Sequence, residues 1–402
     1  MTNEHRSSLV SLTPVSASHR ARGLFFIGAA VALVGVTMAL QMGLNANFLA
    51  DDIKVTGLQV GQIESVRESC GIMALVVLAA LAGFAEPLVA AAMLLLVAAG
   101  LSTYSLVHSF TWVMLMSLVW SQGLHVWMPL PSSMTLSLAE PDRAGLRLGQ
   151  IQSAGAAGFA GGLGLALLLT TLGVGMRPMY LLAGVMGVLA AGACIAIPRQ
   201  IKTPGPRLVV SRRYGLYYVL NLLEGWRKQI AISFAGFLLV RVYGTPLPTI
   251  LLLMIAVQVI GYVASPRVGR LIDRVGERPV LMFYYSCLTV FFVGYALIRN
   301  AGMLYGIFIL DNAFFVFGMS LTTYVSRIAR PGELTPTLSM GVAMNHVAAV
   351  TMPFVGGLLW KHVGYQWTFL IGAAAAVVSI GVTTLVPRRE MRTDKAEKAK
   401  TV

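Results

Sequence analysis

Long stretches without a charged residue recur along the whole chain, and they restrict the fold more than any other feature of the sequence. The stretches 242–266 and 279–298, for example, contain no Asp, Glu, Lys or Arg. An apolar stretch of about 20 residues is long enough to cross a bilayer as a helix. Only 11% of the 402 residues are charged, whereas a soluble globular chain has about 25%. We therefore expect most of this chain to lie in lipid.

Twelve apolar segments can be distinguished in the sequence. Backbone groups in hydrocarbon must hydrogen-bond within their own segment, so each segment is predicted to be a helix. Strand-length segments of alternating hydropathy, which are typical of a membrane barrel, are absent from the sequence. The predicted fold class is therefore an all-α membrane protein with 12 transmembrane helices. The segments are 23–47, 58–84, 87–107, 109–131, 149–173, 178–198, 216–241, 247–266, 279–298, 301–325, 338–360 and 366–386.

The distribution of basic residues indicates how these helices are oriented. If the N-terminus is cytoplasmic, 22 of the 30 Lys and Arg residues fall in inside segments and 5 fall in outside loops. This bias follows the positive-inside rule. It also explains the net charge of +14 without nucleic-acid binding, because these residues face the anionic inner leaflet. We expect a monomeric, multi-pass protein in contact with lipid in a bacterial inner membrane, with both termini cytoplasmic.

A polar stretch near the middle, "PRQIKTPGPRLVVSRRYG" (198–215), separates six predicted helices from six others. Two similar stretches, 136–149 and 326–341, follow the fourth helix of each half, and internal repeats of this kind are typical of transporters. The predicted parts are a cytoplasmic N-terminal segment (1–22), a six-helix bundle (23–198), a linker (199–215), a second bundle (216–387) and a cytoplasmic tail (388–402).

The stretch "GRLIDRVGERP" (269–279) concentrates charge between the eighth and ninth segments. It resembles the signature loop of the major facilitator superfamily, G-x-L-x-D-R-x-G-x-R. The resemblance implies two six-helix pseudo-repeats and a loop that latches the two halves in one conformation. The chain departs from the family at Val119, where many members have an arginine in the fourth helix. The predicted latch residues are Gly269, Asp273, Arg274, Gly276 and Arg278.

Ionisable residues also occur inside the apolar segments, where each costs about 2.5–3.5 kcal/mol at the centre of a helix. They are absent from the third, sixth, ninth and twelfth segments, which the resemblance implies are peripheral. The segments that carry polar groups are those that the resemblance places around a central cavity. The candidate residues for substrate binding or coupling are Arg67, Glu68, His125, Glu224, Arg227, Lys228, Asp311, Asn345 and His346.

Two interpretations of the charged candidates stay open. Glu64 can pair with Arg67, and Glu224 can pair with Arg227 or Lys228, because residues three or four apart are neighbours on a helix. Alternatively, carboxylates exchange protons and cations contact a substrate of anionic character, since the protonation of a buried carboxylate responds to nearby cations.

Four of the candidates can be ranked as proton carriers or as packing residues. Asp311 has no nearby cation and is the first candidate for a proton carrier, followed by Glu68. His125 and His346 are expected to be hydrogen-bonded residues of the cavity or of the packing rather than coupling groups.

The function predicted from these observations is secondary-active transport of a small organic solute by alternating access, with proton coupling. The alternative is a membrane sensor or scaffold of the same fold. We expect no enzyme, ATP-driven pump, cofactor or metal site, because no catalytic, metal-ligand or phosphate-binding motif occurs at a usable spacing. Uptake or efflux, and proton or sodium coupling, stay open at this point.

Overall fold

The computed structural model describes residues 17–81, 83–139, 144–199, 211–330 and 333–388. These residues form helices joined by short turns, with no β-strand among them. This confirms the predicted all-α fold class. Most of the predicted N-terminal segment, linker and C-terminal tail lies outside the described residues.

The first half of the chain begins with α1, which passes directly into a short π-helix, η1. A capping box formed by Thr56 and Gln59 starts the next helix, because each side chain satisfies a free backbone N–H of the first turn. The helices of this half are α1 (Ala17–Asn47), η1 (Phe48–Asp52), α2 (Gly57–Ala80), α3 (Glu86–Thr103), α4 (Phe110–Trp127), α5 (Leu130–Leu138), α6 (Ala144–Thr171) and α7 (Met176–Ile195).

The second half contains two helices that change their winding near the middle. A π-helical turn interrupts one of them and a 3-10 turn interrupts the other, and such interruptions often occur at functional sites. The helices are η3 (Arg212–Tyr214), α8 (Gly215–Ile230), η4 (Ala231–Ala235), α9 (Gly236–Arg241), α10 (Leu247–Val275), α11 (Glu277–Leu297), α12 (Ala301–Ala313), η5 (Phe314–Gly318), α13 (Met319–Ile328), α14 (Leu334–His362) and α15 (Tyr365–Thr383).

When the interrupted helices are joined, the described residues form twelve long helical segments, each overlapping one predicted segment. Nine helices within the described ranges are long and apolar enough to cross a membrane. The segments outside this set are α2, α4 and the run from α8 to α9. They carry six of the nine candidate site residues, so polar groups are concentrated where the apolar signal is weakest.

Several helix boundaries differ from the prediction by a few residues, and two of them differ by seven residues or more. The fourth predicted segment ends at residue 131, but helix resumes as α5 after a break at Met128 and Pro129 and continues to Leu138. The eighth predicted segment ends at residue 266, but α10 continues to Val275. The predicted latch loop is therefore mostly helical. Gly276 alone separates α10 from α11, with a φ of 83° that favours glycine.

Glycines allow α1 and α6 to approach very closely. Residues 153–164 of α6 are mostly Gly and Ala, which suits close packing of helices. A Cβ atom added to Gly158 would lie 2.0 Å from the carbonyl oxygen of Ala32, and one added to Gly35 would lie 2.5 Å from that of Gly155. No side chain fits at either position. Close backbone contact of this kind is how helices associate in lipid.

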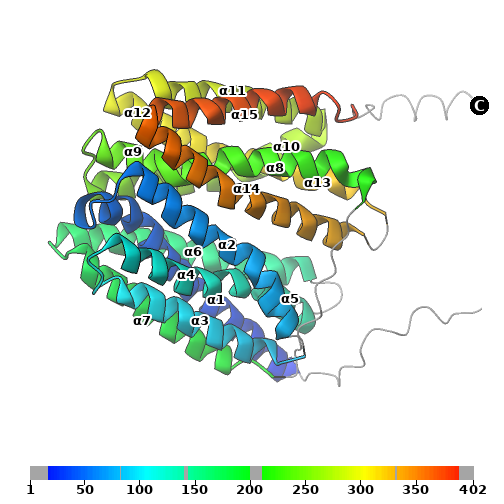
Figure 1. Ribbon diagram of the computed structural model, residues 1–402. Helices are drawn as coiled ribbons and strands as arrows, with labels where there is room; N and C mark the ends of the chain where they lie inside the picture. Colours follow the sequence, from blue (N-terminus) through cyan, green and yellow to red (C-terminus); the bar gives the residue numbers. More distant parts are fainter. Residues whose placement is uncertain (1–16, 82, 140–143, 200–210, 331–332, 389–402) are drawn as a thin grey trace, which may run out of the picture.

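The two halves, α1–α7 and α8–α15, lie side by side (Figure 1). The described chain begins and ends at the same end of the molecule, which we call the terminal face; the opposite end is the far face. Near the far face, α2 packs against α14 through glycines: a Cβ atom on Gly61 would lie 2.1 Å from the carbonyl oxygen of Pro353. Asn47 also donates a hydrogen bond across the halves to the Thr245 carbonyl, at 3.3 Å.

Candidate functional site

The first cluster of ionisable side chains is built on α2 around Arg67. One terminal nitrogen of Arg67 lies 2.5 Å from Oε2 of Glu64 and 2.7 Å from Oε1 of Glu68. The guanidinium group also lies over the Trp120 ring, 5.5 Å from its centroid. The Arg67 side chain is 13% exposed and that of Glu68 is 12% exposed. The structure therefore contains the predicted Glu64–Arg67 pair and adds Glu68 to it.

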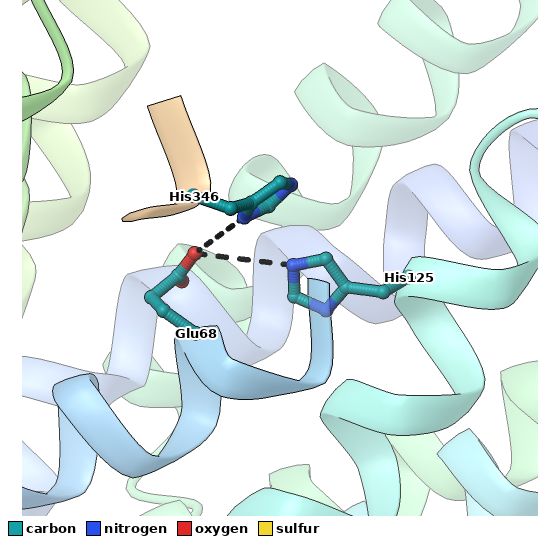
Figure 2. Close-up of side chains that lie close together, drawn as sticks. All are labelled: Glu68, His125 and His346. Carbon is teal, nitrogen blue, oxygen red and sulfur yellow. Dashed lines mark ion pairs between the residues drawn. The ribbon is translucent and has the colours of Figure 1, made fainter. Parts of the chain in front are cut away.

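The second oxygen of Glu68 faces two histidines from other helices (Figure 2). Nε2 of His125, on α4, lies 3.9 Å from Oε2 of Glu68. Nδ1 of His346, on α14, lies 3.5 Å from the same oxygen. The centroids of the two imidazole rings are 5.0 Å apart. Glu68 and His125 belong to the first half and His346 to the second, so this cluster crosses between the halves.

Two residues that sequence reasoning missed hold the histidines in place. Ser121 donates a hydrogen bond to the Arg67 carbonyl at 3.0 Å, and its own carbonyl accepts one from Nδ1 of His125 at 2.9 Å. Gly71 provides the space for His346, because an added Cβ atom would lie 2.3 Å from Nδ1 of that ring. Gly71 follows Glu68 by three residues, a spacing that places it on the same helix face.

The second cluster lies inside the second half around Arg227, whose side chain is completely buried. A terminal nitrogen of Arg227 lies 2.5 Å from Oε1 of Glu224 and 2.7 Å from the Tyr284 hydroxyl. Tyr284 donates a hydrogen bond to the same carboxylate oxygen at 2.9 Å. Sequence reasoning missed Tyr284, because it lies on α11, a helix expected to be peripheral.

Asp311 on α12 is completely buried near the second cluster. Among the described residues no hydrogen bond of normal geometry reaches either of its carboxylate oxygens, but the buried hydroxyl group of Tyr295, on α11, lies close to this carboxylate. Arg227 is close enough to attract it electrostatically, and Nε and Nη1 of this arginine also lack partners there. A charged group without a hydrogen-bond partner is costly at membrane depth. Asp311 and Arg227 are therefore residues whose retention here has a reason other than packing.

Lys228 differs from the two arginines. It is partly exposed, and its ammonium group lies 5.7 Å from the centroid of the Phe315 ring. Within the described parts of the chain it forms no ion pair.

Asn345 is partly buried, and Gly225 packs against its backbone: a Cβ atom on this glycine would lie 3.0 Å from the Asn345 carbonyl oxygen. The neighbouring residue, His346, contacts α2. This turn of α14 therefore packs against α8, the helix that carries Glu224 and Arg227, as well as against α2.

The predicted site residues thus separate into two groups rather than one. Arg67, Glu68, His125 and His346 meet in the first cluster, whereas Glu224, Arg227 and Asp311 lie together in the second half. His125 and His346, which the sequence suggested as hydrogen-bonded cavity or packing residues, both face the carboxylate of Glu68.

The predicted latch residues lie where α10 meets α11. Arg274 is exposed and Arg278 is partly exposed, while Gly269 lies within α10. The side chain of Asp273 is outside the described part of the chain. Glu277 is buried there and forms an ion pair with Arg327 of α13. At the corresponding place in the first half, the buried Glu86 accepts a hydrogen bond from Ser133 at 2.7 Å.

The chain matches one family of known proteins and is similar in structure to two solved proteins. The family model described as Major Facilitator Superfamily matches residues 24–335 and 217–402. No curated protein matches the chain by sequence. The structure is similar to the crystal structure of the nucleoside transporter NupG, with 14% identity, coverage of 91% of this chain and 99% of that chain, and a TM-score of 0.75.

A second similar structure is that of a bacterial homolog to the human lysosomal transporter Spinster in an inward-facing and occupied conformation. Its identity is 14%, it covers 92% of this chain and 97% of that chain, and the TM-score is 0.70. At these identities the similarity concerns the fold. Together with the family match over most of the sequence, it shows that the chain belongs to the major facilitator superfamily and is a multi-pass membrane transporter.

Proposed function

We propose that the protein moves a small organic solute across the bacterial inner membrane by alternating access, and that protons drive this movement. The observation that carries the proposal is the position of Glu68 between the two halves. Its partners are Arg67 and His125 from the first half and His346 from the second. When the halves move apart at this level, Glu68 loses a partner, and its affinity for a proton changes because that affinity depends on neighbouring charges.

Asp311 is the proposed proton carrier. Its two oxygens and two nitrogens of Arg227 form no hydrogen bond of normal geometry among the described residues. A small shift of α12 relative to α8 would bring these groups together. Asp311 would then exchange a proton for a direct pair with Arg227, and this exchange would couple proton movement to conformation.

Lys228 is the proposed contact for the solute. Arg67 and Arg227 are held by carboxylates. Lys228 is partly exposed, its ammonium group lies near the Phe315 ring, and it forms no ion pair with the residues that the structure describes. An ammonium group in this state can bind an anionic or strongly polar group of a solute without first breaking an ion pair. Lys228→Gln should weaken solute binding, and Lys228→Arg should restore part of it.

The junction of α10 and α11 is the proposed conformational latch, on the cytoplasmic side. Replacing Asp273 by Asn should slow the exchange between inward-facing and outward-facing states without changing which solute is carried. Solute exchange between two sides of a vesicle measures this rate. A changed solute profile with a normal rate would contradict the latch role.

Transport by the purified protein in liposomes tests the function as a whole. Thermal-shift screening of nucleosides, sugars and organic anions would first select solutes that bind. The selected solute should accumulate when a pH gradient is imposed, and a protonophore should stop its accumulation. Empty liposomes are the control.

The same experiment separates the alternative function, a sensor or scaffold of this fold. The pairing of both arginines with carboxylates is the feature that this alternative predicts. A solute that raises the melting temperature but never crosses the membrane under any gradient would favour the sensor.

A further inference from the structure

The three side chains that meet between the halves face one another without forming hydrogen bonds. Nδ1 of His346 and Nε2 of His125 lie 3.5 and 3.9 Å from Oε2 of Glu68 (Figure 2), whereas an N–H to oxygen hydrogen bond measures 2.7–3.2 Å. Nδ1 of His346 is buried and has no hydrogen-bond partner among the described residues. Oε2 of Glu68 and the two ring nitrogens therefore face each other across a space that no direct hydrogen bond closes.

The hydrogen bond of His125 to Ser121 indicates which nitrogen of its ring carries a hydrogen and which faces Glu68 without one. Its Nδ1 atom lies 2.9 Å from the Ser121 carbonyl oxygen. A carbonyl only accepts hydrogen bonds, so Nδ1 must carry a hydrogen. In the neutral ring Nε2 then presents a lone pair toward Glu68, which presents one as well. Two facing acceptors are stabilised by a positive species between them, either a proton on Nε2 of His125 or a metal ion, and the metal-binding experiments below distinguish the two. A hydrogen bond from the second ring nitrogen to a carbonyl is also how proteins orient histidines that bind metal ions.

Distances and charge both suit a metal ion. The three ligand atoms lie within 4.8 Å of one another. With metal–ligand bonds of 2.0–2.2 Å, two ligands of a tetrahedral ion lie about 3.4 Å apart, close to the separations found here. Arg67 occupies the other oxygen of Glu68, and with Glu64 and Glu68 the group carries a net charge of −1 when both histidines are neutral.

We propose that Glu68, His125 and His346 form a binding site for a divalent transition-metal ion that bridges the two halves. Two imidazoles and one carboxylate, with a fourth position left open, are a ligand set that proteins use for Zn²⁺, and imidazole ligands also suit Ni²⁺, Cu²⁺ and Fe²⁺. The ligands come from α2, α4 and α14, so a bound ion holds the halves together in the conformation described here. The sequence did not predict this site, because its ligands are too far apart along the chain to form a motif. The inference does not depend on solute transport.

Metal binding to the full-length, tag-free protein in detergent tests the proposal. Zn²⁺ should bind with a 1:1 stoichiometry in isothermal titration calorimetry, and Co²⁺ should give d–d absorption bands. Glu68→Gln, His125→Ala and His346→Ala should each weaken binding by about 100-fold, the upper end of the loss seen when even a supporting residue of a metal site is removed. His108→Ala and His362→Ala, at exposed positions outside the cluster, are the matched controls and should bind as the native protein does.

Thermal melting distinguishes variants that have lost metal binding from variants that fail to fold. Zn²⁺ should raise the melting temperature of the native protein in a concentration-dependent way, because it binds the folded state. The three cluster variants should melt cooperatively without this shift. Absence of saturable binding to the native protein would overturn the proposal. It would also be overturned if a control variant lost binding while the cluster variants retained it.

Discussion

Arg67 and Arg227 both hold carboxylates at membrane depth, but they are surrounded differently. Arg67 is partly exposed, and its partner Glu68 reaches histidines on both sides of the boundary between the halves. Arg227 is fully buried, and its hydrogen-bonded partners, Glu224 and Tyr284, belong to its own half. The first cluster therefore depends on how the halves are arranged, whereas the second is part of the interior of one half. A conformational change should alter the first cluster directly.

Asp311→Asn should have the largest effect on transport. The amide cannot exchange a proton, so accumulation driven by a pH gradient should fall to the level of empty liposomes, while expression and melting temperature stay near native values. Asp51→Asn, on the far face, is the matched control. If Glu68→Gln abolished accumulation and Asp311→Asn did not, the roles of the two clusters would be reversed.

The two arginines should differ in what their removal costs the folded state. Arg227→Gln leaves Glu224 as a buried, uncompensated charge, which typically costs about 3–5 kcal/mol of unfolding free energy. Arg67→Gln should cost less, about 1.5–3 kcal/mol, the value of a hydrogen bond to a charged group. It removes the cation from the buried Glu64 as well as from Glu68, but Arg67 and Glu68 are both partly exposed, so water can replace part of the lost interaction. Reversible unfolding in detergent measures both.

The double variant Arg227→Gln with Glu224→Gln provides the control for this comparison. It removes both charges and should recover part of the loss. Equal losses for the two single arginine variants would show that exposure does not distinguish the clusters.

Two buried glutamates near the terminal face, Glu277 and Glu86, allow the same comparison of a charged with a neutral partner. Arg327→Gln leaves the buried carboxylate of Glu277 without its ion pair and should cost about 1.5–3 kcal/mol. Ser133→Ala removes a neutral donor from Glu86 and should cost about 1 kcal/mol. Chemical denaturation would rank the two, and a larger loss for Ser133→Ala would mean that the ion pair contributes little.

Gly71→Ala should have the smallest effect on stability but a specific effect on the first cluster. The added methyl group displaces the His346 ring, which can yield, so the cost should lie near the lower end of the 1–3 kcal/mol typical of overpacking. Gly192→Ala, where nothing lies within 4 Å, should be neutral or should stabilise α7 by about 0.5–1 kcal/mol. Thermal melting compares them, and identical behaviour would mean that His346 is not held where the structure places it.

The helical fold and the approximate position of each helix could be predicted from the sequence, because a bilayer determines the length and the polarity of every helix that crosses it. The pairs Glu64–Arg67 and Glu224–Arg227 could also be predicted, since residues three apart share a helix face. The meeting of His125 with His346 could not, because it depends on the angles at which three helices pack. Tyr284 was missed for a related reason: a tyrosine in an apolar helix shows nothing in the sequence that reveals where its hydroxyl points.

At Gly61 the two halves meet through backbone atoms alone, opposite the carbonyl of Pro353. Interlocked side chains would have to change rotamer before one helix could roll over the other, but two smooth backbones need not. This contact can therefore serve as a pivot near the far face, where a rotation of a few degrees becomes a displacement of several ångströms at the opposite end of helices about 40 Å long. A bulky residue at position 61 would prevent this rotation of α2 against α14, although every charged group would stay in place.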